Sequence, residues 1–143
     1  MRKISWGAAA VAALAGAGVY ALAQDNNKKD AGKMRFFEIR TYTANPGKME
    51  ALHKRFRDHT NRLFAKHNIE MVGYWTVVKG EGTENTLVFI LAYPNAEARE
   101  AAWKAFGNDP EWQKAKTESE KEGPLVGKVD SRFLAPTDYS PIK

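Results

Sequence analysis

Three side chains that can bind a ligand or take part in catalysis alternate along one short stretch of the chain. Glu38, Arg40 and Tyr42 occupy every second position of FFEIRTYTA, so they point to one side of a predicted strand. A buried carboxylate and guanidinium are tolerated when they pair or meet a ligand. Two interpretations stay open. These residues line a polar cavity for a small organic molecule or anion, or Glu38 and Arg40 form an ion pair that aligns two copies of the chain.

His59 is the histidine that falls among apolar residues of a predicted helix. It lies on the stripe formed by Met49, Leu52, Phe56 and Leu63. Such a histidine is a candidate general base or axial haem ligand. The structural alternative is a histidine that only forms a hydrogen bond in the core or at its edge.

A dedicated metal site is not predicted. His53 and His67 are expected in solvent, the histidines do not share i, i+4 spacing, and no acidic residue completes a ligand set. The chain contains no cysteine, which excludes disulfides, thiolate zinc sites and cysteine nucleophiles.

Aromatic residues offer a further candidate binding surface. Tyr74 and Trp75 are adjacent in a predicted strand and therefore point to opposite faces. One is expected under a helix, and the other where it contributes an aromatic wall for a flat ligand. Trp103 and Trp112 are interpreted as anchors that hold helices to the core.

The strand that carries Glu38 must lead directly into the helix that carries His59, because only the turn Asn45-Pro46-Gly47 separates them. Strands are predicted at residues 35–42, 69–78, 86–93 and 128–134. Helices are predicted at 48–67 and 96–106, with a third that begins at Asp109-Pro110 and ends by Gly123. Residues 135–143 are expected to form an extended tail. The order is that of an α+β, ferredoxin-like domain, β-α-β-β-α-β, with a four-stranded antiparallel sheet and helices on one face.

The predicted strands at 69–78 and 86–93 are apolar on both faces, whereas helices can cover only one face of a sheet. Water contact on the other face would forfeit roughly 1.5–3 kcal/mol for each large apolar side chain. The pattern therefore predicts a homodimer in which two sheets pack face to face around a barrel-like centre. If Ile39 faces the helices, Glu38, Arg40 and Tyr42 point into that centre.

The first 33 of the 143 residues have the composition of an export signal and a linker. Arg2 and Lys3 precede an uncharged apolar run that ends in Ala-Leu-Ala, so a signal peptide over 1–23 is predicted, with cleavage between Ala23 and Gln24. The alternative is an N-terminal membrane anchor. Residues 24–33 are predicted to be a disordered linker. We expect a periplasmic or secreted protein without stable membrane insertion after cleavage.

Three groups of motifs occur in order in the body of the chain, from residue 34: EIRTY with PGK, then VGYW, then DPEW with the closing FL and TDYSP. With these motifs, the body resembles the NIPSNAP family of the dimeric α+β barrel superfamily. The resemblance implies the fold and a dimer but no reaction, because the family has no generally established enzymatic activity. It also implies that Asp58 and His59 match an acid–histidine pair of the family's helix. Relatives elsewhere in the superfamily include haem-degrading and antibiotic-biosynthesis-type monooxygenases.

The leading hypothesis is an exported homodimeric binding or assembly module whose cavity holds a small hydrophobic or aromatic molecule, with no cofactor. The alternative is a haem-dependent or cofactor-free monooxygenase or isomerase. In it His59 acts as base or haem ligand, and Arg40, Tyr42 and Trp75 position the substrate. Nucleic acid is not an expected partner, because the basic residues of the first helix alternate with acids and polar groups.

Overall fold

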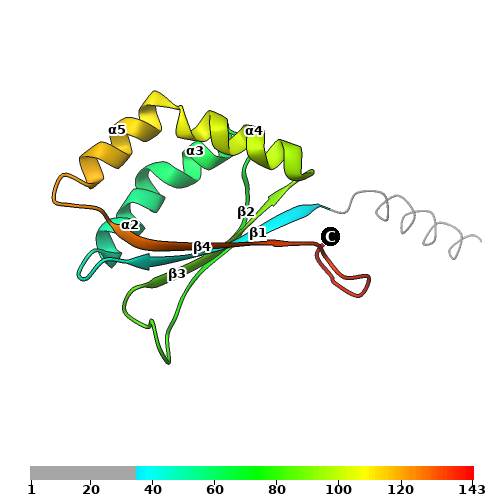
Figure 1. The fold of residues 1–143 in the computed structure, drawn as a ribbon, viewed down its shortest axis with the longest axis horizontal. Helices are drawn as coiled ribbons and strands as arrows, with labels where there is room; N and C mark the ends of the chain where they lie inside the picture. The colour runs from blue at the N-terminus through cyan, green and yellow to red at the C-terminus, as the bar shows by residue number, and fades with distance from the viewer. Residues whose placement is uncertain (1–34) are drawn as a thin grey trace, which may run out of the picture. The chain divides into compact units, whose positions relative to one another are not determined.

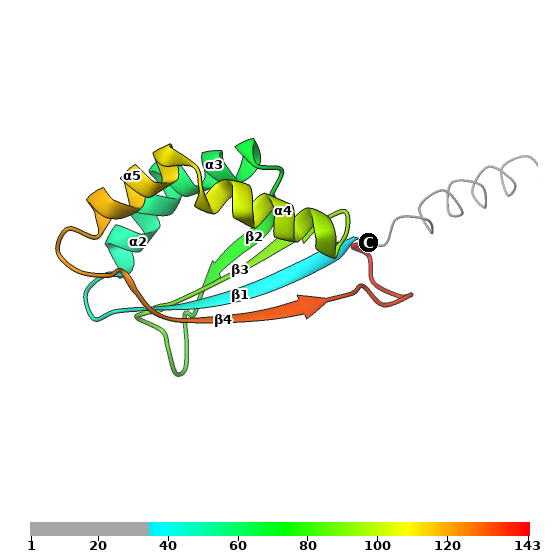
Figure 2. The same ribbon diagram turned by 45° about the horizontal axis from the view of Figure 1, so that its top comes forward.

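The computed structural model describes residues 35–143, which form a four-stranded sheet with all helices on one face (Figures 1 and 2). The elements follow the predicted order: β1 (Phe36–Ala44), α2 (Met49–Arg55), η1 (Phe56–Thr60), α3 (Asn61–Lys66), β2 (Glu70–Thr76), β3 (Thr86–Tyr93), α4 (Ala96–Gly107), α5 (Pro110–Ser119) and β4 (Val126–Leu134). The predicted α+β, ferredoxin-like class is confirmed. The predicted signal peptide and linker lie outside the described residues. Within residues 35–143, no helix has the length and apolar character needed to cross a membrane.

The sheet order is β2-β3-β1-β4, with every neighbouring pair antiparallel. β1 is central and pairs with β3 and β4, for example through Ile39 opposite Ile90 and opposite Arg132. β2 and β4 are the edges of the sheet. Nearly every residue of β4 is exposed, because the helices lie over the other three strands.

The helices begin and end at the capping and turn residues that the sequence predicted. Gly47 takes a positive φ of 72° in the turn after β1, and Asn68 ends the first helical run with φ 58°. Asn95 and Asp109 cap α4 and α5 by accepting hydrogen bonds from the backbone N–H groups of Ala98 and Glu111, each at 2.8 Å.

The first helical run differs from the prediction in one place that matters for His59. A π-helical turn, η1, separates α2 from α3, and the backbone N–H of Asn61 bonds to the carbonyl of Phe56. The hydroxyl of Thr60 also donates to the carbonyl oxygen of Arg55 at 3.2 Å. Because Thr60 takes the buried position at 2% exposure, His59 is only partly buried and lies off the apolar stripe on which it was predicted.

The core lies between the helices and the sheet. Its fully buried side chains come from both layers: Leu52, Leu63, Phe64, Phe89, Leu91 and Tyr93. Phe64 packs against Phe106 at 4.9 Å between ring centroids, and Phe106 against Trp112 at 4.5 Å. Trp103 contacts Phe64 at 5.5 Å, so both tryptophans anchor helices as predicted.

The orientation of β1 is the reverse of the one expected if Ile39 met the helices. Glu38 is fully buried under α4, while Ile39 is partly exposed on the open face of the sheet. Alternation along a strand identifies which residues share a face but does not say which face the helices will cover. Glu38, Arg40 and Tyr42 therefore belong to the helix side of the sheet.

Candidate functional site

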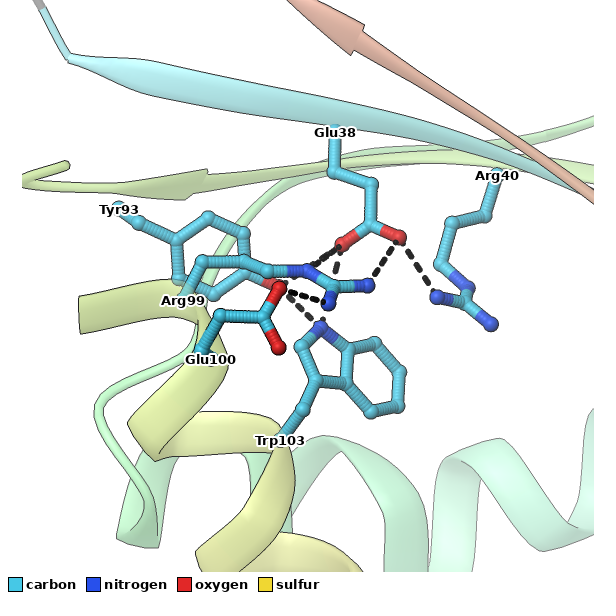
Figure 3. Close-up of polar contacts among 6 residues, drawn as sticks. All are labelled: Glu38, Arg40, Tyr93, Arg99, Glu100 and Trp103. Atoms are coloured by element: carbon cyan, nitrogen blue, oxygen red, sulfur yellow. Dashed lines mark hydrogen bonds and ion pairs between the residues drawn. The ribbon is translucent and has the colours of Figure 1, made fainter. Parts of the chain in front are cut away.

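The buried carboxylate of Glu38 is the centre of a polar cluster between β1 and α4 (Figure 3). Arg99 binds it with two donors, Nε to Oε2 at 3.0 Å and Nη2 to Oε1 at 2.9 Å. Arg40, two residues along β1, donates Nη1 to Oε1 at 2.6 Å. Trp103 donates its indole N–H to Oε2 at 3.1 Å and to the Tyr93 hydroxyl at 2.8 Å.

The surroundings of Glu38 keep it ionised. Burial by itself would raise the pKa of Glu38, but hydrogen bonds and charge from Arg99 and Arg40 outweigh burial and hold that pKa below its ordinary value. Burial and the Glu38 charge raise the pKa of Tyr93, so its hydroxyl stays protonated. Since both carboxylate oxygens are fully occupied, Glu38 is a fixed anion that ties α4 to the sheet rather than a free acid or base.

Arg40 adds a second guanidinium to a single carboxylate. Its guanidinium lies 4.3 Å from the Trp103 ring and 5.4 Å from the Tyr42 ring. Its Nε has no hydrogen-bond partner among the described residues. Glu38 and Arg40 do pair, as one interpretation expected, but on the helix side, where the pair cannot align two sheets.

Tyr42 borders this cluster through Arg40, whereas Trp75 lies apart from it. Tyr42 packs edge-on against Phe89 at 5.0 Å, inside the aromatic core. Tyr74 stacks on Phe89 at 5.5 Å, whereas Trp75 pairs in register with Val88 on the opposite face and is 51% exposed. The two aromatics point to opposite faces, and Tyr74 packs under the helices, as expected for one of them. That Trp75 faces a dimer centre stays a prediction. Trp75 also lines a cavity of about 270 Å³ at the edge of β2.

His59 lies in yet another place. It lines a cavity of about 240 Å³ between the first helical run and α5, together with charged side chains that include Lys54, Arg55, Asp58 and Glu118. The structure therefore does not bring His59 into one site with Arg40, Tyr42 and Trp75.

The prediction that His67 lies in solvent is wrong, because its ring contacts a buried carboxylate. Its Nε2 lies 2.7 Å from Oδ2 of Asp109, the capping residue of α5, and Lys66 Nζ lies 2.7 Å from the same oxygen. Hydrogen bonds from Lys66, which has the larger effect, and from His67 hold the pKa of Asp109 well below its ordinary value. The group joins α3 to the start of α5. Within residues 35–143, no three His, Asp or Glu side chains come together as a metal-binding group.

The open face of the sheet carries a cavity that is lined mainly by apolar side chains. Its volume is about 330 Å³. The sheet provides Phe37, Val72, Ile90 and Leu134, and the C-terminal tail provides Pro136 and Ile142 among others. The tail reaches this position because it turns at Thr137–Ser140 and because Arg35 Nε donates to the carbonyl oxygen of Lys143 at 2.6 Å.

Sequence reasoning missed Arg99, Tyr93 and Trp103 as partners of Glu38. One signal was available, because Arg99 and Trp103 stand four residues apart and so share a side of their helix. Their alignment with Glu38 depends on where α4 crosses the sheet, which no local pattern specifies.

A family model described as NIPSNAP matches residues 37–141. A NIPSNAP family protein with unknown function from Agrobacterium tumefaciens has a similar structure, with TM-score 0.66 and 25% sequence identity, covering 78% of this chain and 96% of that chain. A NIPSNAP-like domain protein from Burkholderia xenovorans has TM-score 0.67 and 21% identity, covering 76% and 90%.

A more distant structure is that of SnoaB, described as a cofactor-independent oxygenase from Streptomyces nogalater. It has TM-score 0.50 and 15% identity, covering 75% of this chain and 97% of that chain, so the likeness is one of fold alone. Among curated proteins, no match to this chain was found.

Proposed function

This chain belongs to the NIPSNAP family, and from that premise we propose that it acts as an exported homodimer that binds a small hydrophobic or aromatic molecule. Export rests on the Arg2-Lys3 start, the apolar run and the Ala-Leu-Ala ending before Gln24. Dimerisation and binding rest on the open face of the sheet.

The apolar character of that face is the observation that carries the proposal. Ile39 of β1 lies on it directly opposite Ile90 of β3, with Val88 beside them, and Trp75 and Leu134 extend it to the edges. Phe37 lies on the same face but is already buried. Trp75 is 51% and Leu134 is 40% exposed. An apolar surface of this kind is typical of an interface. If a second copy covers this face, each large apolar side chain that becomes buried stabilises the dimer by roughly 1.5–3 kcal/mol.

Charges on β4 favour a second copy over an unrelated partner. Asp130 and Arg132 stand on the same open face, opposite Thr41 and Ile39 of β1. A two-fold axis brings each residue of one copy toward the matching surface of the other, so an acid and a base on one strand can pair reciprocally across it. Asp130 pairs within its own strand with Lys128, at 2.9 Å between Oδ2 and Nζ, and both side chains are exposed, so this pair leaves Asp130 open to a partner across the axis.

The cavity under the C-terminal tail is the proposed ligand site. Its apolar lining and its volume of about 330 Å³ suit a small hydrophobic or aromatic molecule. Closure by a second sheet would remove that molecule from water, which strengthens apolar binding. Assembly and ligand binding would therefore depend on the same surface.

Substitution at the centre of the open face tests the dimer. Ile39→Arg places a charge beside Arg132 of the same face, and we expect the mature protein to sediment as a monomer while wild type sediments as a dimer. Thr117→Arg, on an exposed position of α5, adds the same charge to the helix layer and should leave the dimer intact. A monomeric wild type at micromolar concentration would overturn the proposal. A native mass spectrum of wild type from its own host tests for a retained small molecule.

The oxygenase alternative lacks a comparable observation. A haem bound at His59 would have to enter a cavity of about 240 Å³ lined by charged side chains, which does not suit a flat apolar macrocycle. The residues proposed to position a substrate lie in other parts of the fold. The residues around His59 therefore do not fit haem.

A further inference from the structure

The cavity at the edge of β2 carries a second set of features that the proposed function does not use. On the helical side it is lined by His53, Arg57 and Asn61, which stand at i, i+4 and i+8 and therefore share one side of the run. The π-helical turn η1 lies between the first and the last of them. Such turns are frequent at functional sites.

The other wall of this cavity is aromatic and aliphatic. Phe56 and Tyr74 both line it, with their ring centroids 5.6 Å apart, and Leu87 lies beside them. Trp75 and Thr76 of the edge strand complete this wall. A flat apolar body fits such a wall, and the volume of about 270 Å³ limits the occupant to a small molecule.

The charges of the lining favour an anion. Arg57 is one of the lining residues, and no Asp or Glu is among them. The present partner of Arg57 is Glu50, at 2.9 Å, with side chains that are 63% and 81% exposed. An exposed pair of this kind contributes little to stability. Arg57 can therefore exchange Glu50 for a ligand carboxylate, which a guanidinium binds through two parallel hydrogen bonds.

The side-chain oxygen of Asn61, Oδ1, is buried and lacks a hydrogen-bond donor among the described residues. Buried acceptors are nearly always paired. Because this oxygen has almost no accessible surface, a donor from a bound molecule or an ordered water reaches it when the Asn61 amide turns toward the cavity. A hydroxyl next to a carboxylate would supply a donor to Asn61 while the carboxylate meets Arg57.

We propose that this cavity binds a small aromatic carboxylate that carries a ring hydroxyl. Arg57 holds the carboxylate, Asn61 accepts from the hydroxyl, and the ring lies against Phe56 and Tyr74. The site belongs to a single chain and lies between the first helical run and β2. It is therefore distinct from the apolar cavity under the C-terminal tail, although Trp75 both lines it and lies on the open face of the sheet.

Calorimetric titration with salicylate, and with benzoate and phenol as partial matches, tests the site. Wild type should bind salicylate with a Kd of about 1 mM or below, benzoate more weakly and phenol most weakly. Arg57→Gln should weaken salicylate binding about tenfold or more, because it removes the charge-assisted pair. Asn61→Leu should remove the preference for salicylate over benzoate.

Two controls keep the outcome specific. Lys54→Gln removes a positive charge from the same helix at a position outside this cavity and should bind salicylate as wild type does. Ile39→Arg should also bind it unchanged even as a monomer, so loss of the dimer and loss of this site are distinguishable. Absence of salicylate binding in wild type, or equal binding by wild type and Arg57→Gln, would overturn the inference. Equal binding of salicylate and benzoate by wild type would show that water, not a ligand hydroxyl, serves Asn61, and would overturn the hydroxyl assignment.

Discussion

The two faces of the sheet differ in how far their side chains are buried within one chain. On the helix face, even a carboxylate is buried, because Arg99, Arg40 and Trp103 supply it with donors from two elements. On the open face, apolar side chains such as Ile39 and Trp75 stay partly or largely exposed. The helix face is complete within one chain, whereas the open face leaves apolar surface to be covered.

This difference separates stability from assembly. Residues of the helix face should govern unfolding of the single chain, and residues of the open face should govern association. Substitutions on the helix face are therefore measured by unfolding, and those on the open face by association. A helix-face substitution that changed only association, or an open-face substitution that changed only unfolding, would contradict this division.

The largest effect is expected at Glu38. Glu38→Ala leaves the guanidinium groups of Arg40 and Arg99 without their buried partner, and breaking such a cluster costs roughly 3–5 kcal/mol. Urea unfolding followed by circular dichroism measures the loss. Glu100→Ala removes the exposed partner of Arg99 and should change the free energy of unfolding by less than about 0.5 kcal/mol. Equal losses in the two variants would show that the buried cluster is not special.

An intermediate effect is expected at Trp75, and in association rather than in folding. A large aromatic residue at an interface commonly contributes about 2 kcal/mol or more, so Trp75→Ala should raise the dimer dissociation constant about 30-fold. Sedimentation equilibrium measures it. Unfolding of the monomeric Ile39→Arg background should shift little when Trp75→Ala is added, since the side chain is half exposed there. A large shift would place Trp75 in the folding core instead.

The smallest effect is a pH dependence on the helix side. Lys66 and His67 lower the pKa of Asp109, so its contribution to stability is present above its ordinary value of 3.8 and is lost as pH falls through the lower folded pKa. Asp109→Asn keeps the helix cap but removes the charge. The free energy of unfolding of wild type should therefore fall more steeply below pH 4 than that of the variant. Parallel pH profiles would contradict the coupling.

The elements were predictable because their signals are local. The turn at Gly47, the caps at Asn95 and Asp109 and the alternation in β3 each depend on a few neighbouring residues, and each appears in the structure. The candidate sites were not predictable to the same degree. The four proposed binding residues share a strand or an aromatic character, but the fold distributes them over a buried ion cluster, an aromatic core and the open face.

The sequence by itself determined the order of elements, the family resemblance and the presence of more apolar strand surface than one helix layer can cover, since these follow from spacing and side-chain type. Only the tertiary structure decided that Glu38 faces α4, that Thr60 rather than His59 takes the buried position, and that Arg57 and Asn61 share a cavity with Phe56. The physical reason is that side-chain periodicity specifies two faces without naming their neighbours. Which face of the sheet is covered depends on where distant helices cross it. Which residues of the first helical run are buried depends on a single π-helical turn, which shifts the side chains that follow it.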